Sequence, residues 1–315
     1  MRGRRRRLFL HRICTENEVW VQGEEKIAQA ACDYYQQIFT GQNDRVDDRI
    51  LQHIPTLVTP AQNEMMQAMP TLEELRQVVF AMNPSSAAGP DDNQSGFVRG
   101  RRITESIMLA HEITHDIKKP HIGTNVVLKL DMTKAYDRVS WSFTCLVLRR
   151  FGFGEVFIDL VWRIMSKNWY SIIINGHRHG FFHSTRGLKQ GDHLSPALFI
   201  LGAEVLSRLL NSLHQIPSYK GFFMEPKGPQ INHLSFADDV IIFASTDRHS
   251  LKLIMDMLGD YEHTSGQLIN KEKSHFMIPA NTSQDIINTI QAVTRFSQKS
   301  SPITYLGCPL YIVDK

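Results

Sequence analysis

Acidic side chains stand at the end or in the middle of apolar runs at two places in the chain, and these two places most constrain its fold. The run 125–130, NVVLKL, leads directly into Asp131, and the run 234–244, LSFADDVIIFA, carries Asp238 and Asp239 at its centre. Short apolar runs of this kind are typical of buried strands. A charge inside such a run is costly unless it is paired or binds a metal ion. The simplest alternative is that the two adjacent acids form a hairpin turn, a position that Asp favours.

Helical and strand-like segments alternate irregularly along the chain. The Asn175-Gly176 pair inside WYSIIINGHRHGFF predicts a hairpin with a two-residue turn. Residues 234–244 predict a second hairpin, and HFMI predicts a strand. This order favours an α+β fold, with an antiparallel sheet backed by helices on one face, over a doubly wound fold. Apolar spacing predicts helices over 24–39, 71–82, 103–118, 137–150, 155–167, 195–213 and 248–264, and a polar linker over 41–70.

Length and composition allow two parts. With 315 residues, of which 42% are hydrophobic, the chain can bury a sizeable core. We expect residues 1–92 to form a basic tail, helices and a linker, and residues 93–315 to form the main α+β domain. The opening MRGRRRR is either a solvated tail or a nucleic-acid contact.

The cysteines and the apolar runs bear on the compartment. The four cysteines are scattered, which fits a reducing compartment. No apolar run is expected to reach membrane-spanning length, and no signal peptide is evident. We therefore expect an intracellular protein, nuclear or cytoplasmic, that is not secreted and has no membrane partner.

The two acidic places become one site if their strands are neighbours. Asp131 and Asp238 would then converge, and clustered carboxylates repel one another unless a cation lies between them. Hard oxygen ligands suit Mg²⁺ or Mn²⁺. Two such ions form the usual clamp for moving a phosphoryl group.

Five segments resemble the palm of reverse transcriptases, the RNA-directed DNA polymerases, in particular those of plant non-LTR (LINE-type) retrotransposons. The resemblance covers residues 125–310 in the family's motif order and is weaker over residues 7–90. It implies a reverse transcriptase palm that uses an RNA template, a DNA primer, deoxynucleoside triphosphates and two Mg²⁺ (or Mn²⁺) ions. The segments are VVLKLDMTKAYDRVSW (motif A), RGLKQGDHLSPALFIL (motif B), LSFADDVIIFA (motif C), SGQLINKEKSHF (motif D) and YLGCPL (motif E).

The resemblance also implies residue roles at the reacting centre. Asp131 and Asp238 match the metal ligands, Asp239 matches a supporting third carboxylate, and the Met132 carbonyl could add a ligand. Lys273 matches a lysine that protonates the departing pyrophosphate. The alternative for Lys273 is a solvated surface lysine.

Other residues match the parts that hold nucleotide, template and primer. Tyr136 matches an aromatic wall that excludes a 2′-hydroxyl and so selects deoxynucleotides; its alternative is a core residue at a helix start. In motif B, Gly191 would let the backbone approach the base pair, or is a plain loop glycine, and Ser195 is expected to cap the next helix. The nucleotide- and template-binding set is Tyr136, Gln190, Gly191 and Phe236, the primer-grip turn is Tyr305, Leu306 and Gly307, and the candidate phosphate contacts are Arg178, Arg186 and Lys189.

The sequence departs from the family at the fingers and the thumb. GPDD at 89–92 runs directly into NQSGFVRGR at 93–101, where the family has a fingers region that grips the triphosphate. No thumb is expected after motif E. An inactive retrotransposon remnant, with at most weak nucleic-acid binding, is therefore the alternative to an active polymerase.

A distant alternative is a zinc metalloprotease. HEITH places His111 and His115 on one helix face with Glu112 as a possible general base, and His121 follows. The extended zinc motif needs a glycine three residues after the second His to turn the chain, and Lys118 stands there instead. The sequence therefore favours scaffold over zinc chemistry for this stretch.

Overall fold

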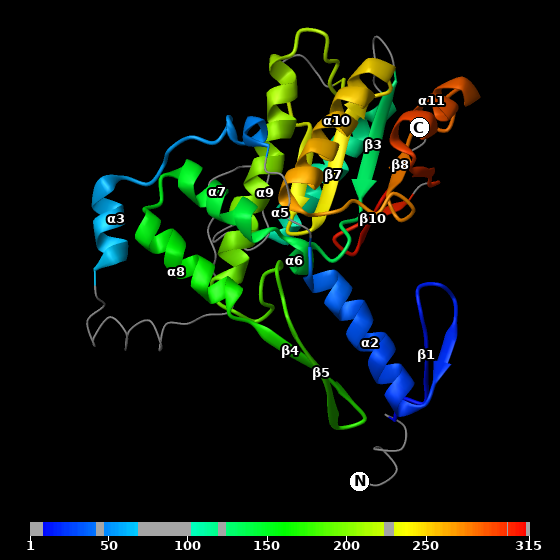
Figure 1. Cartoon of the computed structure of the whole chain (residues 1–315). Helices are drawn as coiled ribbons and strands as arrows, with labels where there is room; N and C mark the ends of the chain where they lie inside the picture. Colours follow the sequence, from blue (N-terminus) through cyan, green and yellow to red (C-terminus); the bar gives the residue numbers. More distant parts are fainter. Residues whose placement is uncertain are drawn as a thin grey trace.

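A five-stranded sheet forms the centre of the protein (Figure 1). The computed structural model describes residues 9–41, 47–68, 102–118, 124–223, 230–300 and 302–312. The strand order is β6-β7-β3-β8-β9, and every neighbouring pair is antiparallel except β8 with the short edge strand β9. The strands are β3 (Asn125–Leu130), β6 (His233–Phe236), β7 (Asp239–Ser245), β8 (His275–Met277) and β9 (Ser297–Gln298).

The central strands are apolar on both faces because both faces are covered. Successive side chains of a strand point to opposite faces. Val126 and Leu128 accordingly join one hydrophobic core, while Val127 joins the other. On β7, Ile242 and Ile241 divide in the same way.

Helices and a small hairpin supply the two covers. The first face packs against α7 (Trp141–Phe151), α9 (Ser195–Ser212), α10 (Arg248–Ser265) and α11 (Gln284–Thr294). The second face packs against α5 (Ile103–His115), η2 (Asp116–Lys118) and the hairpin of β10 (Ile303–Tyr305) and β11 (Cys308–Leu310). The α+β class is confirmed. The expectation that helices cover only one face is wrong. The second face is also apolar, and without a cover its side chains would be exposed to water.

The N-terminal part packs onto this domain. The strands β1 (Arg12–Cys14) and β2 (Trp20–Gln22) form a hairpin before α2 (Glu24–Phe39), the first predicted helix. The predicted linker over 41–70 instead contains η1 (Asp48–Leu51) and α3 (Pro60–Gln67). A capping box between Thr59 and Gln62 starts α3, which shows that a local signal was present in the sequence. The predicted helix 71–82 and the predicted boundary at 92/93 lie outside the described residues.

A long hairpin projects from the domain beside α2 (Figure 1). Its strands are β4 (Trp169–Ile174) and β5 (His177–His183). Asn175 and Gly176 both have positive φ, 52° and 94°, as the predicted two-residue turn requires.

Several helix boundaries differ from the predictions. The predicted helix 137–150 is divided into α6 (Ala135–Arg138) and α7, because Ser140 caps α7 with its hydroxyl. The predicted helix 155–167 is α8 (Glu155–Ser166). Ser195 is not a cap: Leu194 holds that position and Ser195 is the first helical residue of α9.

One helix corrects the expectation about membrane-spanning length. The segment Ser195–Gln215 is long and apolar enough to cross a membrane, with a mean hydropathy of 1.3. Its most apolar window is 67% buried inside the protein. The helix is apolar on most sides because it lies between the sheet and α7 and α10.

Candidate active site at the end of the central sheet

The predicted carboxylates are brought to the same end of the sheet by strand register. The last paired residues of β3 and β7 are Leu130 and Val240, so Asp131 lies one step further, level with Asp239. Asp238 and Ala237 form the turn between β6 and β7, and Asp238 is exposed. The strands that carry the two acidic places are therefore neighbours, as the predicted site requires, and the hairpin turn expected as the alternative is present as well.

The segment between α10 and β8 fixes the backbone around Asp131. The Asn270 N–H donates to the Asp131 carbonyl at 2.8 Å, and the Thr133 N–H donates to the Leu268 carbonyl at 2.8 Å. These two bonds form an antiparallel bridge between Met132 and Ile269 without using the Met132 carbonyl. The carboxylates of Asp131 and Asp238 and the Met132 carbonyl are hard oxygen donors of the kind that Mg²⁺ and Mn²⁺ prefer. This donor set therefore fits such an ion.

Asp239 has a different neighbourhood from the other two acids. Its carboxylate forms an ion pair with the Lys129 ammonium, inside the same sheet. Burial lowers the pKa of Lys129 to about 8, while Asp131 and Asp238 act in the opposite direction, so the ammonium stays charged at neutral pH. The sequence contained a signal for this residue, because Lys129 is a charge inside the apolar run of β3.

The predicted primer-grip residues form a tight turn next to Asp239. Tyr305 pairs with Cys308, so Leu306 and Gly307 are the two turn residues, with φ of 50° and 79°. A left-handed backbone suits glycine but costs a residue with a β-carbon roughly 1–2 kcal/mol. The second carboxylate oxygen of Asp239 accepts a hydrogen bond from the Leu306 N–H at 3.2 Å.

Tyr136 stands beside the carboxylates on a packed platform. Its ring stacks on Phe199 of α9, with centroids 4.4 Å apart and planes 5° apart. Burial, and next the charge of Asp238, raise the pKa of Tyr136 to about 12. The ring is therefore fixed in place and its hydroxyl is neutral. This fits both the predicted role, an aromatic wall that excludes a 2′-hydroxyl, and the alternative role of a core residue.

The remaining predicted residues lie on exposed loops and turns, except Phe236, which is the partly buried last residue of β6. Gln190 is exposed and donates a hydrogen bond to the Asp137 carboxylate at 3.2 Å. Gly191 has φ of 84° and open space around it. Phe236 pairs with Asp239 across the β6–β7 hairpin. Lys273 is exposed, which agrees with the alternative that it is a solvated surface lysine.

One candidate phosphate contact is used for structure instead. Arg186 is buried, and its guanidinium donates to the carbonyls of Ile38 and Gln37 at 2.7 and 3.2 Å. These carbonyls belong to the last turn of α2, where helix carbonyls lack partners and a cation is favourable. The expectation that Arg186 contacts phosphate is therefore wrong, whereas Arg178 and Lys189 are exposed.

No group of three or more His, Cys, Asp or Glu side chains in the described part of the chain is arranged to hold a metal ion. This result includes Asp131, Asp238 and Asp239. It applies equally to HEITH: Glu112 and His115 are exposed on α5, away from the buried Ile113. His121 and the 89–101 join lie outside the described residues.

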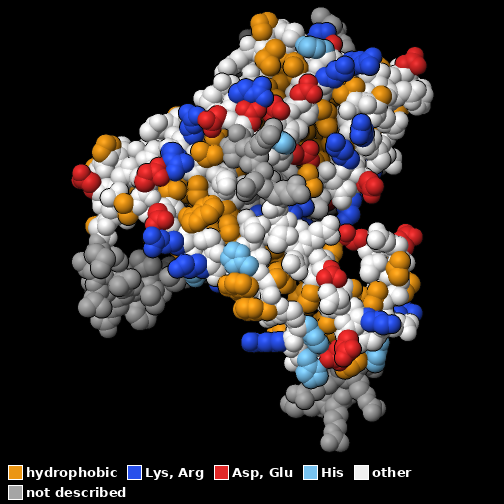
Figure 2. Space-filling view, in the orientation of Figure 1, with side chains coloured by type: hydrophobic (Ala, Val, Ile, Leu, Met, Phe, Trp, Pro, Cys, Tyr) orange, Lys and Arg blue, Asp and Glu red, His pale blue; other side chains and the backbone are white. Residues whose placement is uncertain are grey.

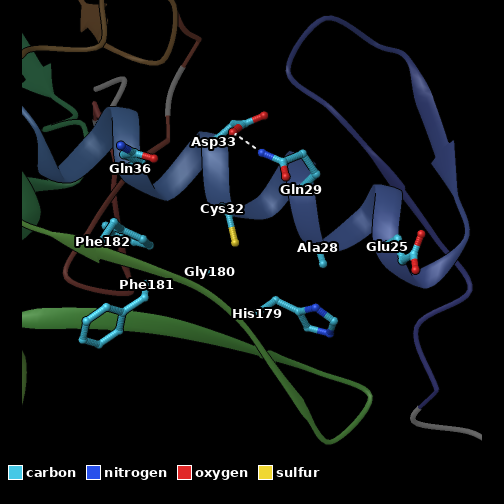
Figure 3. A pocket seen from close by; sticks show the side chains of 10 residues that line it. All are labelled: Glu25, Ala28, Gln29, Cys32, Asp33, Gln36, His179, Gly180, Phe181 and Phe182. Atoms are coloured by element: carbon cyan, nitrogen blue, oxygen red, sulfur yellow. Dashed lines mark hydrogen bonds between the residues drawn. The ribbon is translucent and has the colours of Figure 1, made fainter.

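A pocket between α2 and β5 contains none of the predicted site residues (Figure 3). Figure 3 shows the Cys32 thiol pointing from α2 toward Gly180 of β5. A β-carbon at Gly180 would come within 2.5 Å of that sulfur. Burial raises the pKa of Cys32, so the thiol is held neutral and inert at the helix–hairpin contact.

Aromatic side chains cover the outer face of the β4–β5 hairpin. Trp169 and Phe181 are 57% and 74% exposed and stack on each other with centroids 4.7 Å apart. Figure 2 shows hydrophobic side chains gathered over α8 and this hairpin. Residues 167–189 contain no Asp or Glu but include Lys167 and Arg178. The hairpin thus offers exposed rings in a segment without negative charge.

Comparison with known proteins identifies the family of this chain. Residues 45–310 match the family described as reverse transcriptase (RNA-dependent DNA polymerase), so the chain belongs to that family. This confirms the resemblance inferred from the five motifs.

Several relatives of the chain come from retrotransposable elements. The chain is 30% identical over 195 residues, 62% of its length, to the Pol polyprotein of the type-2 retrotransposable element R2DM of Drosophila melanogaster. It is also 30% identical over 205 residues, 64% of its length, to the Pol polyprotein of a type-1 element R2 of Popillia japonica. The matches span 18% and 28% of those polyproteins. A solved structure of apo telomerase from Candida tropicalis aligns with 70% of this chain and 39% of its own, with a TM-score of 0.48 and 16% identity.

Proposed function

We propose that this chain carries the RNA-directed DNA polymerase centre of a non-LTR, LINE-type retrotransposon. The observation that carries the proposal is the convergence of Asp131 and Asp238 at one end of the sheet, beside a Met132 carbonyl left out of the local bridge. Family membership supports this reaction class. The substrates proposed are an RNA template, a DNA primer and deoxynucleoside triphosphates.

The oxygen donors at the sheet end would hold the metal ions. Two bound Mg²⁺ or Mn²⁺ ions supply activation of the attacking primer hydroxyl and stabilisation of the leaving oxygen. Asp131 and Asp238 carry the negative charge that attracts them, and the pairing of β3 with β7 and of β7 with β6 keeps both residues at the same end of the sheet. Lys273, exposed three residues after Asn270, is the proposed proton donor to pyrophosphate.

Residues around these acids would position the nucleic acids and the nucleotide. Tyr136, stacked on Phe199, provides a rigid surface for the sugar of the incoming nucleotide. The Leu306–Gly307 turn lies close enough to Asp239 for a hydrogen bond, and this contact supports the proposal that the turn guides a primer end to the acids. Gln190 and Gly191 lie on an exposed loop joined to α6, suited to the nascent base pair.

The exposed rings of the β4–β5 hairpin would contact single-stranded template. Bases stack on exposed aromatic rings without regard to sequence, and each stacked base contributes about 1–3 kcal/mol. Trp169 and Phe181 present such rings, and Arg178 on the same hairpin is available for phosphate.

Primer extension tests the proposal directly. The purified chain is expected to extend a DNA primer on an RNA template with Mg²⁺ or Mn²⁺, and Asp131→Asn or Asp238→Asn should abolish extension. Asp256→Asn, the same change on the exposed face of α10, is the matched control and should keep activity. Absence of extension by the wild-type chain with either ion would contradict an active polymerase. The inactive alternative would then predict salt-dependent RNA binding alone.

A further inference from the structure

Two contacts converge on one carboxylate at the proposed centre. One oxygen of Asp239 pairs with the Lys129 ammonium, and the other accepts the Leu306 N–H at 3.2 Å. The contacts join the central strand β3, the first residue of β7 and the turn of the β10–β11 hairpin. Leu306 is 67 residues away from Asp239 in the sequence, so the contact is purely tertiary.

The ion pair has the burial expected of a structural contact. The Lys129 and Asp239 side chains are 14% and 30% exposed. Lys129 also donates to the Leu130 carbonyl at 3.0 Å, which holds its ammonium at the end of β3. A carboxylate paired with a mostly buried ammonium has less negative charge to offer a metal ion.

The turn that Asp239 holds is in a backbone conformation that leucine disfavours. Leu306 has φ of 50° and Gly307 has φ of 79°. Such a conformation persists only where surrounding contacts fix it. The buried Tyr305 ring anchors one side of the turn in the second hydrophobic core, and the Asp239 carboxylate fixes the Leu306 N–H.

We propose that Asp239 and Lys129 are positioning residues that tie the 306–307 turn to the strands carrying Asp131 and Asp238. Asp239 thus acts through the turn, and metal binding is left to Asp131, Asp238 and the Met132 carbonyl. The consequence for catalysis rests on the proposed polymerase function. A fixed turn would hold the primer end at a constant distance from Asp131 and Asp238, whereas a mobile turn would let this distance vary.

The tether itself is tested without any activity, by amide hydrogen exchange of the 303–310 segment followed by mass spectrometry. Asp239→Ala removes the acceptor and should speed exchange of this segment at least tenfold. Asp239→Asn keeps an oxygen for the Leu306 N–H and should give an intermediate rate, and Lys129→Met should do the same. The matched control is Lys220→Met, which breaks the Lys220–Asp247 ion pair of 2.8 Å elsewhere and should leave the segment unchanged. Wild-type exchange in Asp239→Ala would overturn the proposal.

Metal affinity separates a tether from a ligand. Binding of Mn²⁺, followed by electron paramagnetic resonance, should weaken at least tenfold in Asp131→Asn and stay within twofold of wild type in Asp239→Asn. If Asp239→Ala fails to fold, Asp239→Asn and Lys129→Met still carry both measurements. A tenfold loss of Mn²⁺ affinity in Asp239→Asn, with normal affinity in Lys129→Met, would make Asp239 a metal ligand and overturn the proposal.

Kinetics test the consequence for the reaction. Asp239→Asn and Lys129→Met should each raise KM for the primer–template at least fivefold, with the Mg²⁺ concentration for half-maximal rate unchanged. The double variant should be no worse than either single one, because both remove the same link. An inactive wild-type chain would contradict the proposed polymerase function. The hydrogen-exchange result would still test whether Asp239 and Lys129 hold the 306–307 turn.

Discussion

Gly187 lies directly against the main chain of Asp137. A β-carbon at position 187 would come within 2.6 Å of the Asp137 carbonyl oxygen, and Gly187 has φ of 92°. Two hydrogen bonds of 2.8 Å join the same segments, from the Gly187 N–H to the Val139 carbonyl and from the Leu188 N–H to the Tyr136 carbonyl. The motif B loop is therefore fixed onto α6, the short helix that carries Tyr136.

Replacing Gly187 should destabilise this junction. We expect Gly187→Ala to lower the free energy of unfolding by about 2–4 kcal/mol, since both the backbone conformation and the space are lost. Urea denaturation gives the measurement. Gly176→Ala is the matched control, because Gly176 has nearly the same φ, 94°, but open space around it. Equal losses in the two variants would show that the close approach to Asp137 contributes nothing.

Tyr136 should govern the choice of sugar in the proposed reaction. Removing the ring in Tyr136→Ala opens space beside Asp238, so discrimination against ribonucleotides should fall at least about tenfold. Tyr136→Phe keeps the ring on Phe199 and should keep the discrimination. The ratio of kcat/KM for deoxy- and ribonucleoside triphosphates is the measurement, and an unchanged ratio in Tyr136→Ala would restore the plain core role.

The ring pair on the β4–β5 hairpin should contribute to RNA binding. Trp169→Ala with Phe181→Ala should weaken binding of a single-stranded RNA about tenfold or more, because two stacking surfaces are lost. Fluorescence anisotropy at two salt concentrations separates this loss from phosphate contacts, whose contribution falls with salt. Met65→Ala, at a 75% exposed residue of α3, is the control. Affinity unchanged in the double variant would place the template elsewhere.

Cysteine labelling should report the helix–hairpin contact. Cys14 is exposed, whereas Cys32 and Cys145 are buried. Burial raises the pKa of Cys145 to about 11, so its reactive thiolate is scarce until the pH approaches that value. Iodoacetamide at pH 8 should therefore modify Cys14 rapidly and leave Cys32 and Cys145 unmodified in the folded chain. Rapid modification of Cys32 at pH 8 would contradict the packing of α2 on β5.

The burial of Cys145 also makes the free energy of unfolding fall as the pH rises from 9 through 11. In this range the folded state retains a thiol proton that the unfolded state has released.

Local sequence predicted most elements that depend on neighbours along the chain. The Asn175-Gly176 turn was predictable because few residue pairs adopt two successive positive φ angles easily. The strand β3 was predictable because its apolar run is short and continuous. Even α3, which lies within the predicted linker over 41–70, begins with a capping box formed by Thr59 and Gln62.

The sequence by itself determined the family, the strands that end in Asp131 and Asp238, and the hairpin turns, because each depends on residue order over a few positions. Only the tertiary structure decided which charges meet. Arg186 seemed a phosphate contact by position, yet it caps α2 through a contact across 148 residues. Asp239 has the same side chain as Asp238 one position earlier, but it is the first residue of β7 and has Lys129 and Leu306 as neighbours, whereas Asp238 lies in the exposed turn. Such pairings depend on how distant segments pack, and short-range patterns carry no information about them.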